Sequence, residues 1–174
     1  NVYLGNPNLK KANTAIEFTQ EQIYEFMRCK EDPVYFANNY IKIVSLDEGL
    51  TQFHPYHFQE KLINNFHENR FNICKMPRQT GKSTTVVSYL LHYAVFNDSV
   101  NIGILANKAA TARELLGRLQ TAYENLPKWM QQGIISWNKG SLELENGSKI
   151  LAASTSASAV RGMSFNILFL DEFA

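Results

Sequence analysis

Residues 75–87, KMPRQTGKSTTVV, contain the residue types of a phosphate-binding loop. In such a loop, backbone N–H groups at the start of a helix converge on a phosphate, and the helix dipole adds partial positive charge. Here Gly81 permits the tight turn, Lys82 would reach the β- and γ-phosphates, and the Ser83 hydroxyl would ligate Mg²⁺. Met76 stands where the usual G-x-x-x-x-G-K-S/T pattern has its first glycine. The residues predict a nucleotide site with a variant loop; the alternative is an ordinary turn that exposes a lysine.

A second group of chemically capable residues follows the apolar run ILFL at 167–170, where Asp171 and Glu172 are adjacent. Charges at the tip of a buried strand are costly unless they serve a metal or a partner. Asp171 would hold Mg²⁺ through a water, while Glu172 would orient and deprotonate an attacking water. The alternative is that the two carboxylates simply open a loop. Both motifs, in this order and context, favour ATP hydrolysis over binding alone.

The pattern around these motifs predicts the elements that position them. Apolar strands alternate with helical stretches from residue 70 onward, and strands of this kind joined through helices indicate a parallel sheet covered on both faces. The Asn146-Gly147 pair between two alternating runs predicts a β-hairpin. The predicted strands are 70–76, 99–107 and 166–172, the hairpin is 141–154, and the helices are 82–96 and 108–126.

The N-terminal part predicts a small helical subdomain. Residues 1–17 lack periodicity and suggest a mobile leader, and a capping box of Thr19 and Gln22 predicts a helix over 20–30. A second helix is expected after Pro33 and a third near residue 58. Their predicted buried residues are Phe36, Tyr40 and Ile43 for the second, and Phe58, Leu62 and Phe66 for the third. We therefore expect a leader with short helices over 1–50 and a core over 51–174.

Composition narrows the function further. The 174 residues carry a formal net charge of +1. Any DNA binding must therefore depend on a local group of basic residues or on parts outside this chain. Two cysteines without C-x-x-C spacing favour a reducing compartment over secretion. No apolar run is long enough for a membrane span and the N-terminus lacks a signal-peptide core, so we expect a soluble intracellular protein. The four histidines show no metal-ligand spacing.

The sequence resembles the large terminase subunit of tailed bacteriophages, myovirus type. The resemblance is carried by four segments: PRQTGKST, IISWNKGSLELENGSKI, SAVRGMSF and FNILFLDEFA. The resemblance runs from about residue 18 to 174. It implies an ATPase that pumps double-stranded DNA into an empty capsid. It also implies a P-loop NTPase core of the RecA-like, ASCE type: an α/β three-layer sandwich with a mostly parallel sheet, behind a small helical N-terminal subdomain.

The resemblance also implies site residues. Asp171 matches the Mg²⁺ aspartate and Glu172 the catalytic glutamate, and ATP with Mg²⁺ is the implied substrate pair. Phe58-Gln59 resembles an adenine-binding aromatic–glutamine pair, although a phenylalanine at helical spacing can equally be core. The predicted nucleotide-binding residues are Phe58, Gln59, Arg78, Gln79, Thr80, Gly81, Lys82, Ser83 and Thr84.

Two arginines compete for the arginine finger, which stabilises charge in the phosphoryl-transfer transition state. Arg161, in AVRGMSF, would be contributed to a neighbouring subunit's site, whereas Arg78 would act within its own loop. A surface salt bridge is the structural alternative for Arg161.

Rival functions remain open from sequence. A superfamily 2 helicase or translocase shares the aromatic–glutamine element, the phosphate loop and the Asp-Glu pair, but usually continues Asp-Glu with Ala and then His or Asp, whereas this chain reads Asp-Glu-Phe-Ala. A module that binds ATP without turnover is a second rival.

The resemblance further implies partners and a location: double-stranded DNA, the portal of the procapsid, the small terminase subunit, a homo-oligomeric ring and no membrane. The protein would act in the host cytoplasm at the portal vertex and would not remain in the virion. The strand after Asp-Glu would insert between that strand and the phosphate-loop strand, beyond Ala174, and nuclease activity would belong to a later domain. We therefore expect a portion of a longer polypeptide, with 1–174 alone poorly stable and essentially inactive.

Overall fold

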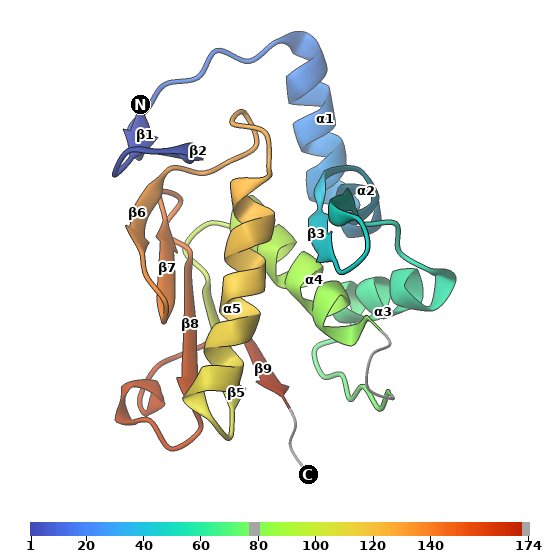
Figure 1. Cartoon of the computed structure of the whole chain (residues 1–174), viewed down its shortest axis with the longest axis vertical. Helices are drawn as coiled ribbons and strands as arrows, with labels where there is room; N and C mark the ends of the chain where they lie inside the picture. The colour runs from blue at the N-terminus through green and yellow to red at the C-terminus, as the bar shows by residue number, and fades with distance from the viewer. Residues whose placement is uncertain (77–80, 172–174) are drawn as a thin grey trace.

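The computed structural model describes residues 1–76 and 81–171, and within them five strands form one mixed sheet beside a group of helices (Figure 1). The strands are β1 (Val2–Tyr3), β2 (Asn6–Lys10), β3 (Lys42–Ser45), β4 (Gly49–Gln52), β5 (Asn101–Ala106), β6 (Ile134–Trp137), β7 (Ser141–Leu144), β8 (Lys149–Ser154) and β9 (Ile167–Asp171). The helices are α1 (Gln20–Glu31), α2 (Pro33–Tyr40), α3 (His57–Glu68), α4 (Lys82–Phe96) and α5 (Ala109–Glu124), with a 3-10 turn η1 (Ser158–Val160).

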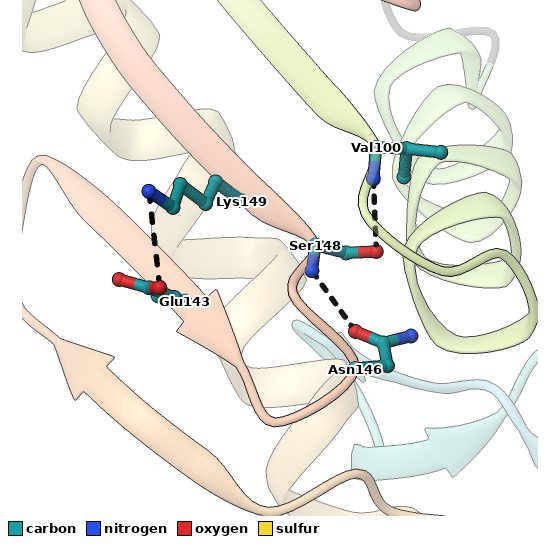
Figure 2. Close-up of polar contacts among 5 residues, drawn as sticks. All are labelled: Val100, Glu143, Asn146, Ser148 and Lys149. Carbon is teal, nitrogen blue, oxygen red and sulfur yellow. Dashed lines mark hydrogen bonds and ion pairs between the residues drawn. The ribbon is translucent and has the colours of Figure 1, made fainter.

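The main sheet has the order β6-β7-β8-β5-β9. β5 is parallel to β8 on one side and to β9 on the other, while β7 and β6 extend the sheet in antiparallel fashion. Glu143 and Lys149 face each other across β7 and β8 and form an ion pair of 3.8 Å (Figure 2). The predicted strands and hairpin from residue 99 onward are confirmed, and the fold class is α/β with a mixed sheet. β6 was not predicted.

Helix α5 lies over one face of β5 and β8 (Figure 1). On β9, Ile167 and Phe169 pack toward the core, whereas Leu168 and Leu170 remain about half exposed. Within residues 1–76 and 81–171, this second face of β9 therefore lacks the cover that a parallel sheet with two buried faces would have. On β5, by contrast, residues that point to both faces are buried, so in the described part of the chain the expected cover is present at β5 and lacking at β9.

The strand predicted over 70–76 is wrong. Residues 71–76 belong to no strand, and the side chains of Phe71 and Ile73 are 83% and 100% exposed. An apolar run becomes a strand only when a neighbouring strand accepts its backbone hydrogen bonds. Among the described residues, no strand pairs with the free edge of β9 or with this segment.

The N-terminal helices form, with differences in what they bury. α1 has the predicted Thr19–Gln22 capping box. α2 buries Phe36, but Ile43 belongs to the β3–β4 hairpin instead of this helix. α3 is rotated relative to the prediction. Its fully buried residues are Gln59 and Ile63, while Phe58 is 46% exposed.

The predicted mobile leader is wrong for residues 2–10, which form the β1–β2 hairpin. The buried Gln131 amide donates to the Asn8 carbonyl (2.9 Å), and its oxygen accepts the Lys10 N–H (3.0 Å). Lys11 pairs with Ile134 at the start of β6, and Leu9 is buried. These partners lie more than 120 residues away in sequence, so local periodicity could not reveal them.

Helix α4 is buried on nearly all sides because α2, α3 and α5 surround it. Polar side chains at the β7–β8 turn cap its C-terminal end. Figure 2 shows two of them, Asn146 and Ser148, with the contacts from Asn146 to Ser148 and from Ser148 to Val100. The Asn146 amide donates to the carbonyls of Ala94 (2.8 Å) and Asn97 (3.2 Å). Ser148 Oγ donates to the Asn97 carbonyl (2.6 Å) and accepts the Val100 N–H (3.4 Å). These contacts satisfy carbonyls that a helix end leaves unpaired, and they join α4 to the sheet.

Candidate nucleotide site

The candidate site begins where α4 begins. Gly81 is the N-cap, with φ of 76° and ψ of 17°, the left-handed conformation that only glycine adopts at little cost. The Thr85 N–H donates to the Gly81 carbonyl (3.1 Å) and starts the helical ladder. The first turn contains Lys82 and no acidic side chain. This end of α4 therefore offers a positive side chain and the positive end of the helix dipole.

Gln59 on α3 contacts the end of the loop directly. Its amide nitrogen donates to Thr85 Oγ1 (3.1 Å) and to the Gly81 carbonyl (3.3 Å), and its oxygen accepts the Tyr56 N–H (2.9 Å). Thr85 Oγ1 in turn donates to the Gly81 carbonyl (2.8 Å). A Cβ at position 81 would lie 2.5 Å from Gln59 Nε2, so a side chain there would displace the Gln59 amide, in addition to the strain of the positive φ. The structure thus brings Gln59 and Gly81 together, and it adds Thr85, which sequence reasoning missed.

An exposed aromatic pair flanks Gln59 at the start of α3. The rings of Tyr56 and Phe58 are nearly parallel, with an interplanar angle of 11° and centroids 6.0 Å apart. Both side chains are substantially exposed. The alternative that Phe58 is core is excluded, because a core ring would be covered. Tyr56 was not predicted, since it precedes the helical pattern that drew attention to Phe58.

The segment before the loop runs close to the start of α4. Burial raises the pKa of the Cys74 thiol, and the nearby Lys82 ammonium partly counteracts that rise. Ser83 is partly exposed. Thr84 faces elsewhere: together with Val87 it lines a cavity of about 420 Å³ against α5 and the β3–β4 hairpin. Within the described residues, Thr84 therefore lies on a different side of α4 from the Gln59 contacts.

The carboxyl end of the sheet positions Asp171. Ala106 of β5 is opposite Ser154 of β8 on one side and Asp171 of β9 on the other. Ligands of open α/β sheets bind beyond the carboxyl ends of their strands, which is where Asp171 lies. In the described part of the chain, no three His, Cys, Asp or Glu side chains gather as a ready-made metal cluster.

Arg161 is exposed at the end of η1, in the connection from β8 to β9. It makes no ion pair with any described residue, so the salt-bridge alternative finds no support in residues 1–76 and 81–171. Arg78, Gln79, Thr80 and Glu172 lie outside the described residues. None of the described helices combines the length and apolar character needed to cross a membrane.

Comparison with known proteins identifies a family and a similar fold. The family described as "Terminase large subunit, T4likevirus-type, N-terminal" matches residues 73–174. The fold is similar to the crystal structure of the HK97 bacteriophage large terminase, with a TM-score of 0.65 and 19% sequence identity over 81% of this chain. The match spans 30% of the HK97 chain. The family match includes the Gly81-Lys82-Ser83 segment, the Asn146-Gly147 hairpin and the Asp-Glu pair, and covers more than half of the sequence. The chain therefore belongs to the family of T4-like large terminase subunits, whose N-terminal region it contains.

Proposed function

We propose that this chain is part of the ATPase of a viral DNA-packaging motor, in which ATP hydrolysis drives double-stranded DNA into a procapsid. The observation that carries the proposal is the family match over 73–174, which includes both the loop that ends at Gly81-Lys82-Ser83 and the Asp171-Glu172 pair. The start of α4 supports it, because a left-handed Gly81 followed by Lys82 is the arrangement a phosphate loop requires. The core is accordingly of the RecA-like P-loop type.

Different residues of the chain have separate roles in binding the nucleotide and in hydrolysing it. Lys82 and the first N–H groups of α4 hold the phosphates, and the exposed Tyr56–Phe58 pair offers an aromatic surface on which a base can stack. Glu172 orients the attacking water and takes its proton. An arginine, either Arg78 in the loop or the exposed Arg161 offered to a neighbouring subunit, stabilises the charge on the transferring phosphoryl group.

The donor chemistry fits Mg²⁺. Ser83 supplies a hydroxyl oxygen and Asp171 a carboxylate, and Mg²⁺ commonly binds through one or two such protein ligands while phosphates and waters complete the octahedron. When bound, the ion neutralises phosphate charge. Ser83 would ligate it directly and Asp171 through a water.

The proposed partners follow from family membership. They are double-stranded DNA, the portal of the procapsid, the small terminase subunit and further copies of the same protein in a ring. The work would take place in the host cytoplasm at the portal vertex. The low net charge of +1 implies that DNA is held by local groups or by parts of the gene product outside this chain.

The test is ATP turnover by the full-length gene product, with and without procapsids and DNA. We expect Lys82→Ala to weaken both nucleotide binding and hydrolysis, and Glu172→Gln to keep binding while hydrolysis stops, because the lysine holds phosphate throughout and the glutamate acts on the water. Lys61→Ala, at an exposed lysine of α3, is the matched control and should leave turnover unchanged. Near-normal hydrolysis by Glu172→Gln would remove Glu172 from the catalytic role.

A further inference from the structure

We infer that residues at the beginning of β5 and just before β9 form a seat that fixes the loop carrying Arg161, so that this arginine is presented to a phosphate outside its own chain. The Arg161 loop comprises residues 155–164, in the connection from β8 to β9. The seat consists of four positioning residues: Asn101, Gly103, Phe165 and Asn166. The inference rests on the proposed function, in which an arginine acts on a neighbouring subunit's nucleotide.

The Arg161 loop lies away from the nucleotide site of its own chain. β8 and β9 are both parallel to β5 and lie on opposite sides of it, so their connection returns from the carboxyl edge of the sheet to the opposite edge. In Figure 1 this connection occupies the lower left, whereas α4 begins on the right. Arg161 is exposed within it. This position suits contact with a neighbouring molecule.

Consecutive turns give the Arg161 loop a defined shape. The Arg161 N–H donates to the Ser158 carbonyl (3.1 Å), and the Met163 N–H donates to the Val160 carbonyl (3.4 Å). At the start of the loop, the Thr155 N–H donates to the Ala106 carbonyl at the end of β5 (3.1 Å). Because this backbone is already ordered, less conformational entropy is lost when the guanidinium meets a phosphate.

Two asparagines hold the other end of the loop. The Asn101 N–H donates to Asn166 Oδ1 (2.8 Å), and the Asn166 N–H donates to the Asn101 carbonyl (2.8 Å). The Asn101 side-chain amide donates to the Ser164 carbonyl (3.2 Å). Ser164 lies three residues after Arg161. A shift at this end of the loop therefore moves the arginine.

Gly103 makes room for Phe165 against the sheet. A Cβ at position 103 would lie 2.9 Å from Phe165 Cε1 and 2.9 Å from Leu168 Cδ1. Glycine inside a strand weakens that strand, and it often marks a place where another group approaches the backbone closely. Here the approaching group is the Phe165 ring, which directly follows Ser164. The ring restrains the end of the loop on the face of β5 to which Leu168 also belongs.

A seat that acts through Arg161 has its own kinetic signature. An arginine finger stabilises charge in the transition state, so displacing it should lower kcat and leave the KM for ATP unchanged. A seat residue matters for turnover only while Arg161 is present to be positioned. Its substitution should therefore have no further effect in the Arg161→Ala background.

The experiment measures kcat and KM for ATP with the full-length gene product, procapsids and DNA. We expect Asn166→Ala to lower kcat about tenfold at unchanged KM, because a small misplacement of a catalytic group is costly. Asn166→Asp keeps the oxygen that accepts the Asn101 N–H and should restore most of kcat. The matched control is Asn138→Ala, which should keep wild-type kcat. Its side-chain oxygen also accepts backbone N–H groups, those of Gly140 (2.9 Å) and Ser141 (2.8 Å), but between β6 and β7.

A second measurement needs no nucleotide. Hydrogen exchange of the Arg161 and Met163 N–H groups should accelerate in Asn166→Ala and stay at the wild-type rate in Asn166→Asp. Unchanged exchange in Asn166→Ala, or an equal loss of kcat with and without Arg161, would overturn the inference. Normal turnover by Arg161→Ala beside an inactive Lys82→Ala would leave the ATPase standing and refute the role of the seat. If the wild-type protein does not hydrolyse ATP, the proposed function fails, and the exchange measurement still decides whether the seat holds the loop.

Discussion

Lowering the pH should weaken the packing of α4 through His92. This side chain is 2% exposed and its ring lies against Phe36 and Phe96, with centroids 5.4 and 4.8 Å away. Its Nε2 donates to the Cys29 carbonyl at 2.8 Å, which leaves Nδ1 as the unprotonated nitrogen. Among the described residues Nδ1 has no hydrogen-bond partner. A proton added there would place a charge in an aromatic environment.

Burial lowers the pKa of His92 to about 4, and the Cys29 carbonyl only partly offsets this effect. Because the unfolded chain binds the proton near pH 6.5 and the folded chain near 4, the unfolded state is favoured progressively as the pH falls between these values. The contribution of neutral His92 to stability is fully present above about pH 6.5. Between pH 7 and pH 5 we expect a loss of about 2 kcal/mol, which is a change of roughly 30-fold in the opening equilibrium.

The assay is native-state hydrogen exchange of α4 amides in the full-length gene product at both pH values, corrected for intrinsic exchange rates. His92→Gln keeps a donor for the Cys29 carbonyl but cannot titrate, so its protection should change much less with pH. His57→Gln alters a histidine whose side chain is 80% exposed, and should behave as wild type. Equal pH dependence in His92→Gln and wild type would refute the assignment to His92.

Two further predictions concern the arginine finger and the C-terminal end of α4. If Arg161 acts on a neighbour's nucleotide, assemblies that mix Arg161→Ala with Lys82→Ala subunits should recover part of the turnover that each variant lacks. Absence of recovery in rings shown to contain both subunits would favour Arg78 as the finger or a purely structural role for Arg161. At the other end of α4, Asn146→Ala should destabilise the fold by about 1–3 kcal/mol, because the Ala94 carbonyl loses this side-chain donor and the Asn97 carbonyl keeps only Ser148 Oγ. Denaturant midpoints would measure this effect, and an unchanged midpoint would show that water replaces the amide.

Local chemistry explains what was predictable from sequence. α4 begins at Lys82, directly after the glycine of the loop, and the Asn146-Gly147 pair does form the β7–β8 hairpin. α1 begins with its predicted capping box. Each of these features depends on residues within a few positions of one another, through a positive φ, a turn type or a side chain that reaches its own backbone.

Tertiary structure decided the features that depend on distant partners. Residues 70–76 are as apolar as a strand, yet they remain outside the sheet because no described strand pairs with them. The aperiodic leader forms a hairpin because the Gln131 side chain hydrogen-bonds its backbone and the start of β6 pairs with Lys11. The pattern of α3 predicted a buried Phe58, but packing against α4 buries Gln59 and leaves Phe58 exposed. A buried glutamine is stable there because Gly81 and Thr85 contact its amide. Periodicity records which residues can be buried, whereas the position of a neighbouring helix determines which ones are.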